Sequence, residues 1–447
     1  MGKKSLIIGL DGVPYSLLKT YLEEGLLPNM QEILSQGFHL MQTRASIPDV
    51  SSVSWTSFTT GVNPGEHGIY GFSDLKPYTY SLYFPHSLDV RAPRWWEILG
   101  GTCRGKESSL SHEFSSFKQA YTSIILNVPH TYPAYPMKGI LVAGFVAIDL
   151  EKAVYPPDFA DYFREKGYMI DVDSQKAHHN REEFLEDLFL CLKVRKEVFG
   201  EIFQNQDWDI FFACITETDR LHHFFFPSAL DKDDPYHEIF LKFYKEVDAF
   251  VGELTRKFWE KFGKDSFLMI LSDHGFTSLK KDVFINRYLE EGGFLKLLKE
   301  GEFYEKISPS SIAFAMDPGR IYIHSKRRYP QGRIGEKEIE GVKSELKGYL
   351  KELKDEEGET VLKKILEKEE IYKGPCLSEA PDLVCLPQDG YNLRGRLESE
   401  RVFEESVFKG MHTWHDAFCI LREELTPSQG TSIENLAELI LKYFSSP

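Results

Sequence analysis

Three short apolar segments of the chain each run directly into an aspartate, and this feature constrains the fold most. LIIGL leads into Asp11, IFFACITET into Asp219 and FLMILS into Asp273. A single aspartate after a strand is usually a helix cap or a turn residue. In open α/β sheets, however, ligands bind outside the carboxyl ends of the strands. Three such aspartates therefore predict a crevice lined by carboxylates.

The rest of the chain alternates short apolar runs with longer amphipathic stretches. This rhythm is typical of an α/β fold in which a mostly parallel central sheet is flanked by helices. The predicted strands span residues 5–10, 124–128, 140–143, 209–215 and 267–271. The predicted helices span residues 182–203, 234–262 and 432–443.

A region rich in Lys and Glu interrupts this pattern. We predict a main domain formed by residues 1–281 and 406–447, with residues 282–405 as an inserted smaller lobe or cap. Within the lobe, residues 343–366 have a charged, helical pattern. The alternative is that the region forms an ordinary solvated face of the main domain.

Charge and composition narrow the functions that the chain can have. The 447 residues carry a formal net charge of −16, which would repel a nucleic acid polymer. An acidic protein that binds a small anion needs local positive charge, and divalent metals supply it compactly. No apolar stretch approaches the roughly 18–20 residues that span a bilayer, and the start lacks a secretory signal. We expect a cytoplasmic protein without a membrane partner; the oligomeric state leaves no mark on the sequence.

Histidines accompany two of the three aspartates at ligand spacing. His223 follows Asp219 by four residues, which puts both on one face of a helix, and His274 follows Asp273 directly. His412, in the turn-like GMHTWH, is a further candidate. This mixture of carboxylate and imidazole suits zinc, manganese or iron. We expect structural roles for the neighbouring His222 and for His67, which lies in a Gly-rich turn.

A nucleophile is indicated by the hydroxyl-rich residues 47–61. The spacing of Val53, Trp55 and Phe58 predicts a helix that begins near Ser51 and ends at Gly61. A hydroxyl at its start would meet the free N–H groups that hold a phosphate, and contact with a metal could ionise it. Composition alone does not choose among these hydroxyls.

Five motifs occur in a fixed order along the chain: GLDG, SSVSWTSFTTGVNPGEHGI, TDRLHHFF, LSDHGF and GMH. In this the chain resembles the alkaline phosphatase superfamily, specifically the type I phosphodiesterase/nucleotide pyrophosphatase branch and its relatives described as phosphohydrolases or phosphomutases. The resemblance implies an alkaline-phosphatase-like core with two divalent metal ions, zinc first and manganese or iron as alternatives. It implies one ion on Asp219, His223 and His412, and the other on Asp11, Asp273, His274 and Ser51.

The resemblance also implies the chemistry. Ser51 stands nine residues before Thr60 of the closing Thr-Gly, where the family places its nucleophile, with Ser52 as the second choice. We expect a metal-dependent phosphodiesterase or phosphatase that hydrolyses a small phosphate ester through a phosphoseryl intermediate. One alternative is a phosphomutase or phosphotransferase similar to cofactor-independent phosphoglycerate mutase. Basic residues 320–333 could contribute to the lobe that such an enzyme closes over its site, or they could form a solvated loop. The other is a non-catalytic metal-binding scaffold.

Overall fold

The computed structural model describes residues 2–103, 105–115, 117, 119–428 and 430–446. They form two compact units. The first comprises residues 1–63, 86–277 and 412–447, and the second comprises Pro64–Pro85 and Ser278–Met411. The second unit thus includes residues 64–85 in addition to the region that the sequence pattern marks as an inserted lobe.

The first unit is built on an eight-stranded sheet with the order β2-β19-β9-β1-β8-β5-β6-β7. The five strands from β9 to β6 are parallel, while β19 and β7 run antiparallel to their neighbours. β2 pairs antiparallel with β19. The bounds are β1 Ser5–Leu10, β2 Phe38–Thr43, β5 Ser123–Val128, β6 Gly139–Ala143, β7 Val154–Tyr155, β8 Ile210–Ile215, β9 Phe267–Leu271 and β19 Ala417–Arg422.

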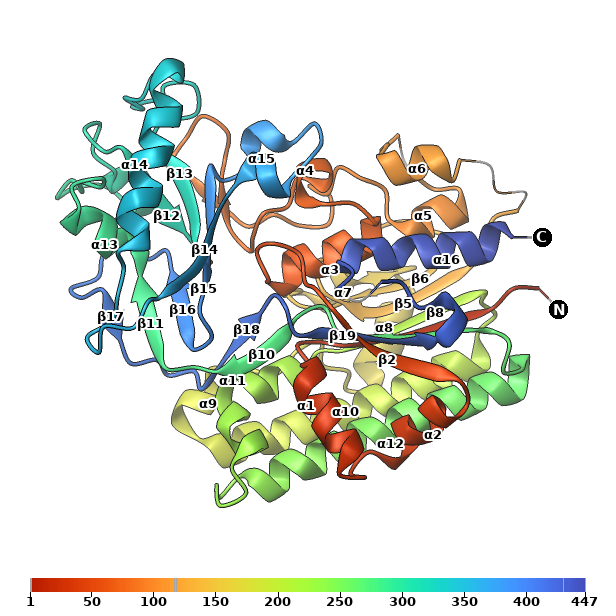
Figure 1. Ribbon diagram of the computed structural model, residues 1–447. Helices are drawn as coiled ribbons and strands as arrows, with labels where there is room; N and C mark the ends of the chain where they lie inside the picture. Colours follow the sequence, from red (N-terminus) through yellow and green to blue (C-terminus); the bar gives the residue numbers. More distant parts are fainter. Residues whose placement is uncertain (1, 104, 116, 118, 429, 447) are drawn as a thin grey trace. The chain divides into compact units, whose positions relative to one another are not determined.

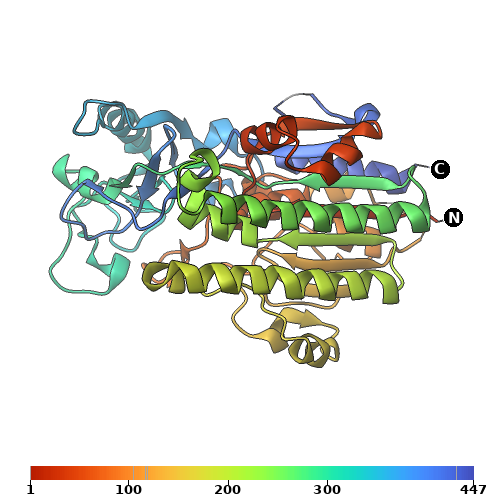
Figure 2. The same ribbon diagram turned by 90° about the horizontal axis from the view of Figure 1, so that it is seen from below.

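Helices cover both faces of this sheet (Figures 1 and 2). On one face, α3 (Ser51–Thr60), α5 (Trp95–Gly100) and α16 (Leu436–Ser445) share a buried core with inward residues of the strands. The long helices α10 (Arg181–Asn205) and α12 (His237–Phe262) lie on the other face, together with α11. The remaining helices are α1 Tyr15–Glu23, α2 Pro28–Ser35, α6 Ser109–Glu113, α7 Leu150–Ala153, α8 Phe159–Glu165, α9 Lys176–His179 and α11 Glu217–Leu230.

The predicted α/β class is confirmed. Each of the five predicted strands occurs within one residue of its expected start, because every one is a short apolar run that is buried on both faces. The predicted helices correspond to α10, α12 and α16. No helix among the described residues combines the length and the apolar character needed to cross a membrane.

The second unit has its own hydrophobic core and a four-stranded antiparallel sheet, β12-β13-β15-β14. A three-stranded sheet, β16-β11-β17, and a short β3-β4 pair accompany it. The strands are β3 Asp74–Leu75, β4 Leu82–Tyr83, β11 Lys281–Phe284, β12 Ala313–Met316, β13 Arg320–Ile323, β14 Leu362–Glu367, β15 Leu383–Pro387, β16 Tyr391–Arg394 and β17 Phe403–Glu404. The helices are α4 Pro64–His67, α13 Ile285–Glu291, α14 Ile339–Lys351 and α15 Lys368–Ile371.

One helical prediction in this unit is wrong. Only the first part of residues 343–366 is helical, since α14 ends at Lys351 and β14 begins at Leu362. Gly358, at φ +84°, lies in the intervening turn, a conformation that an α-helix does not allow. β14 then pairs antiparallel with β15 and buries Leu362. Long-range pairing therefore overrides the local helical pattern.

The basic segment 320–333 is partly occupied by contacts within its own unit. The guanidinium of Arg320 donates to the carbonyls of Asp317 and Ser73, and that of Arg328 donates to the carbonyls of Ala380 and Glu379. A role of this segment in phosphoryl transfer stays a prediction.

Candidate metal centre

The three aspartates lie at the carboxyl ends of three neighbouring strands of the central sheet. Asp11 follows β1 directly, Asp219 is the third residue of α11 after β8, and Asp273 comes two residues after β9 ends. Because the strand order is β9-β1-β8, all three side chains meet at one edge. The expected gathering of carboxylates is therefore present in the structure.

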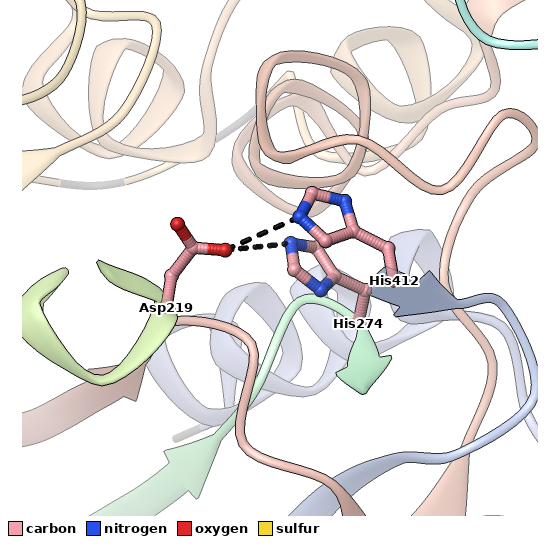
Figure 3. Close-up of side chains that lie close together, drawn as sticks. All are labelled: Asp219, His274 and His412. Carbon is pink, nitrogen blue, oxygen red and sulfur yellow. Dashed lines mark ion pairs between the residues drawn. The ribbon is translucent and has the colours of Figure 1, made fainter. Parts of the chain in front are cut away.

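A first cluster consists of Asp219, His223 and His412. The Oδ1 atom of Asp219 lies 3.2 Å from Nε2 of His412 and 3.5 Å from Nε2 of His223. The two imidazole Nε2 atoms are 3.2 Å apart. His274 comes close as well, with its Nε2 at 4.0 Å from the same oxygen (Figure 3). These nitrogens converge on a single carboxylate oxygen.

A second cluster consists of Asp11, Asp273, His274 and Ser51. The Oγ atom of Ser51 lies 3.3 Å from Oδ1 of Asp11 and 3.1 Å from Nε2 of His274. That nitrogen is 3.6 Å from Oδ1 of Asp11 and 3.3 Å from Oδ2 of Asp273. All seven residues singled out in the sequence are thus brought together in the first unit.

The spacing of these donor atoms fits divalent cations. Zinc ligands lie about 2.0–2.1 Å from the ion, so neighbouring ligand atoms in a tetrahedral site lie about 3.3 Å apart. The contacts within each cluster fall between 3.1 and 3.6 Å. Two groups, Asp219-His274-His412 and Asp11-Asp273-His274, have ligand atoms that all lie within 4.8 Å of one another. Both groups include His274, so this spacing fits a metal ion on either group, and His223 adds a further donor beside Asp219.

Backbone carbonyls orient two of the imidazoles. Nδ1 of His412 lies 2.9 Å from the carbonyl oxygen of Asp49, and Nδ1 of His274 lies 3.0 Å from that of Gly275. A proton on each Nδ1 would be used in these hydrogen bonds, which leaves each Nε2 as the lone-pair atom that faces the cluster. Such a contact is the usual outer partner of a metal-bound histidine.

Burial makes the clustered charges costly without a cation. Asp11, Asp219, Asp273 and His274 are all buried. Burial, followed by the charges of Asp273 and Asp219, raises the pKa of Asp11 well above its ordinary value. Burial also raises the pKa of Asp273 to about 7. Burial would raise the pKa of Asp219 too, but the charges of His223 and His412 lower it well below the ordinary range.

Several residues that support the cluster were not identified from the sequence. Nε1 of Trp55 donates to Oδ2 of Asp11 at 2.9 Å, and the N–H of Gly12 donates to Oδ1 of Asp273 at 3.0 Å. Trp55 follows Ser51 by one helical turn, so its position in the sequence is compatible with the hydrogen bond to Asp11. Its apolar character, however, predicted only a core residue. Arg220 is the third supporting residue that the sequence did not identify, and its Nη1 lies 3.4 Å from Oδ2 of Asp219.

Two histidines that were expected to be structural have contacts of that kind. His67 is buried and its Nδ1 accepts a hydrogen bond from the N–H of Ile69. His222 lies between the carbonyl of Gly12, 3.0 Å from Nδ1, and the hydroxyl of Tyr244, 2.7 Å from Nε2. Burial lowers the pKa of His222 to about 3, so the ring is neutral.

The chain is an α/β protein with a mainly parallel sheet, carboxylates and imidazoles at its carboxyl edge and a serine at a helix start, and it falls in the alkaline phosphatase superfamily. Comparison with known families gives the branch. The model of the type I phosphodiesterase/nucleotide pyrophosphatase family matches residues 5–415, and the chain belongs to this family. The family is described by its phosphodiesterase and nucleotide pyrophosphatase activities.

A curated relative is an uncharacterised pyrophosphatase/phosphodiesterase of Schizosaccharomyces pombe, 23% identical over 273 residues. The match covers 60% of this chain and 44% of the relative, so the chain spans less than half of that protein. Among solved structures, phosphonoacetate hydrolase of Sinorhizobium meliloti has a TM-score of 0.61 at 14% identity, covering 99% of this chain and 96% of its own. The match to murine ectonucleotide pyrophosphatase/phosphodiesterase 5 has a TM-score of 0.55 at 14% identity, and it covers 100% of this chain and 96% of the murine chain. These likenesses establish a shared fold.

Proposed function

We propose that this chain is a metal-dependent phosphodiesterase or phosphatase that hydrolyses a small phosphate ester with Ser51 as nucleophile. One observation carries the proposal: two sets of donor atoms at the spacing of metal ligands, one buried and the other partly buried, adjoin one serine hydroxyl. Family membership supports the same class of reaction.

We infer that the oxygen and nitrogen atoms of the seven candidate residues bind two divalent cations. Asp219, His223 and His412 would hold one, while Asp11, Asp273, His274 and the Ser51 oxygen would hold the other. Carboxylate oxygen and imidazole nitrogen favour zinc, with manganese or iron as alternatives. Bound at these positions, the cations would supply the positive charge that favours the ionised form of Ser51 and that attracts the phosphoryl oxygens. This positive charge is local, in a chain of net charge −16.

The chain's own residues then perform the transfer. Ser51 is the first residue of α3, the helix end that favours anions, so a phosphoryl group meets both the nucleophile and the helix start. The Ser51 oxygen attacks phosphorus, the bond to the leaving group breaks, and phosphoserine forms. Attack of water on phosphorus then restores the serine and releases phosphate where the substrate is a monoester, or a phosphate monoester where it is a diester. Trp55 holds the Asp11 carboxylate beside Ser51 throughout.

Similar proteins support a small substrate. The murine relative was solved as an inactive threonine-to-alanine variant in complex with AMP, and the Sinorhizobium meliloti enzyme in complex with phosphonoacetate. Both ligands are small phosphorus oxyanions. A serine in this chain where the family usually carries threonine preserves the hydroxyl that such chemistry needs. We infer a small phosphate mono- or diester, with the leaving group set by loops around the sheet edge.

The proposal is tested by hydrolysis of nitrophenyl phosphate mono- and diesters with zinc or manganese. Wild-type protein should release nitrophenol, and Ser51→Ala should reduce the rate by at least about 10³-fold, because a nucleophile and a ligand are removed together. Ser52→Ala is the matched control, since this neighbour is equally buried but makes none of the Ser51 contacts, and its rate should stay within about threefold of wild type. Equal rates in wild type and Ser51→Ala would refute the assignment.

A further inference from the structure

Arg220 follows the candidate ligand Asp219 directly and contacts it from the side opposite the imidazoles. Its Nη1 lies 3.4 Å from Oδ2 of Asp219, whereas Oδ1 of that carboxylate faces the Nε2 atoms of His412 and His223. The two carboxylate oxygens thus have separate partners. The guanidinium donates to Oδ2 of Asp219 and leaves Oδ1 free to bind a metal ion.

The guanidinium is itself held in place by two residues distant in the chain. Nη2 donates to Oδ2 of Asp171 at 2.6 Å, and Nε lies 3.1 and 3.2 Å from the two oxygens of Asp171, a bidentate pair. The ring of Phe145 stacks on the guanidinium at 4.2 Å. Bidentate pairing and stacking are available to arginine but not to lysine. Arg220 therefore has a fixed orientation.

The pairing with Asp171 also explains how the positively charged Arg220 can lie beside a candidate metal site. An unpaired guanidinium next to a dication would be repelled by it. Asp171 neutralises most of this charge from the far side, while Nη1 still donates toward Asp219. Arg220 can thus orient the carboxylate at little cost to metal binding.

We propose that Arg220, fixed by Asp171 and Phe145, is a positioning residue that sets the metal affinity of the Asp219-His223-His412 position. This inference rests on the proposed function, because it requires a metal at that position. Without the guanidinium, the Asp219 carboxylate could rotate and offer either oxygen. Loss of such an outer partner typically weakens metal binding by about 10–100-fold. Arg220 makes no hydrogen bond or ion pair with Asp11, Asp273 or His274 among the described residues, so that position should keep its affinity within about threefold.

A second arginine supplies a matched control. Arg195 on α10 is fully buried and its Nε donates at 2.6 Å to Glu217, two residues before Asp219 on the same helix. Arg195 also donates to the hydroxyl of Tyr168, and no contact with a candidate ligand accompanies these bonds among the described residues. Its replacement perturbs the same helix without touching the Asp219 carboxylate.

The test is a chelator-competition titration with zinc that yields two successive dissociation constants. In Arg220→Met, which keeps the side chain's apolar stem, one constant should rise about 10–100-fold and the other should stay within about threefold. Asp171→Asn, which removes the anchoring charge and one of the two acceptor oxygens, should raise the same constant to a smaller extent. Arg195→Lys should change neither constant by more than about threefold, even where its melting temperature falls.

The outcomes separate the two proposals. If both zinc dissociation constants are unchanged in Arg220→Met and in Asp171→Asn, the proposed role of Arg220 is wrong, while the metal-dependent function still stands. Equal weakening of both positions, or the same weakening in Arg195→Lys, would also overturn it by showing a general effect on α11. Wild-type protein that binds no divalent ion would remove both proposals together.

Discussion

At the scale of single residues, Asp273 illustrates a side chain whose environment favours function over stability. It is fully buried, and Oδ2 makes no hydrogen bond among the described residues. Burial raises its pKa to about 7, and the charge of Asp219 contributes in the same direction. A buried, incompletely bonded carboxylate near others of the same charge is costly. A metal ion would relieve this cost.

We predict that Asp273→Asn stabilises the metal-free protein while abolishing metal binding at its position. Because the pKa of Asp273 is raised in the folded state, metal-free wild type should lose stability as the pH rises from about 4 to about 7. At pH 8, with chelator present, the variant should therefore be more stable by about 1–3 kcal/mol. Denaturant unfolding measures the difference. A variant that is less stable than metal-free wild type at this pH would contradict the account.

Local spacing alone predicted the paired ligand candidates, and the family resemblance grouped them with Asp11, Ser51 and His412; neither predicted the partner of Arg220. The pairs Asp219-His223 and Asp273-His274 are four and one residues apart, so their common direction follows from local structure. Arg220 meets Asp171 across 49 positions of the chain. Only the fold brings these two together, and an arginine beside a ligand is otherwise indistinguishable from a surface residue.

At the scale of elements, α3 links the hydrophobic core to the candidate metal centre. All ten of its residues are buried, and Trp55 packs against Phe58 and Phe212 while its indole N–H reaches Asp11. Such a helix has no solvated face, and its bounds still agree with the prediction, because it begins at Ser51 and is followed by the left-handed Gly61. Packing of α3 against β1 therefore fixes both Ser51 and Asp11.

We predict that Gly9→Ala damages both stability and activity. A Cβ at Gly9 in β1 would lie 2.6 Å from Cη2 of Trp55 and 3.1 Å from Sγ of Cys214, closer than van der Waals contact allows. Overpacking of this kind costs about 1–3 kcal/mol. Displacement of Trp55 should also lower the hydrolysis rate, through its hydrogen bond to Asp11. Thermal unfolding and the nitrophenyl phosphate assay measure the two effects.

Gly200→Ala is the control for this substitution. Gly200 lies within α10, and an added Cβ there would meet nothing within 4 Å. Alanine favours a helix interior over glycine, so stability should rise by about 0.5–1 kcal/mol with an unchanged rate. A Gly9→Ala variant as stable and active as Gly200→Ala would show that the contact between β1 and Trp55 is not required.

Element prediction failed where pairing with a distant strand decides the structure. The five parallel strands of the eight-stranded central sheet were predictable because each is a continuous apolar run, whereas β2, β7 and β19 were not predicted. β14 has only one buried residue, Leu362, within a charged sequence, and its extended conformation depends on β15 some 20 residues later. Neither the partner nor the turn at Gly358 can be deduced from the helical charge pattern alone.

At the scale of the whole molecule, the chain forms two units with separate hydrophobic cores. Every residue of the candidate metal centre belongs to the first unit, although its ligands come from three separate stretches of the chain. The Lys- and Glu-rich composition marked residues 282–405, and the structure assigns Pro64–Pro85 to the same unit. That segment has no distinctive charge, so only its packing reveals where it belongs. The identification of the first unit as the catalytic part stays a prediction.

The most direct test of the account is a crystal structure of zinc-loaded protein with phosphate, in which anomalous scattering locates the metal ions. We predict two zinc ions, one bonded to Asp219, His223 and His412 and the other to Asp11, Asp273, His274 and the Oγ atom of Ser51. Phosphate should contact both ions at the start of α3. Ions bound elsewhere, a single ion distant from Ser51, or no bound zinc at all would contradict the proposed two-metal centre.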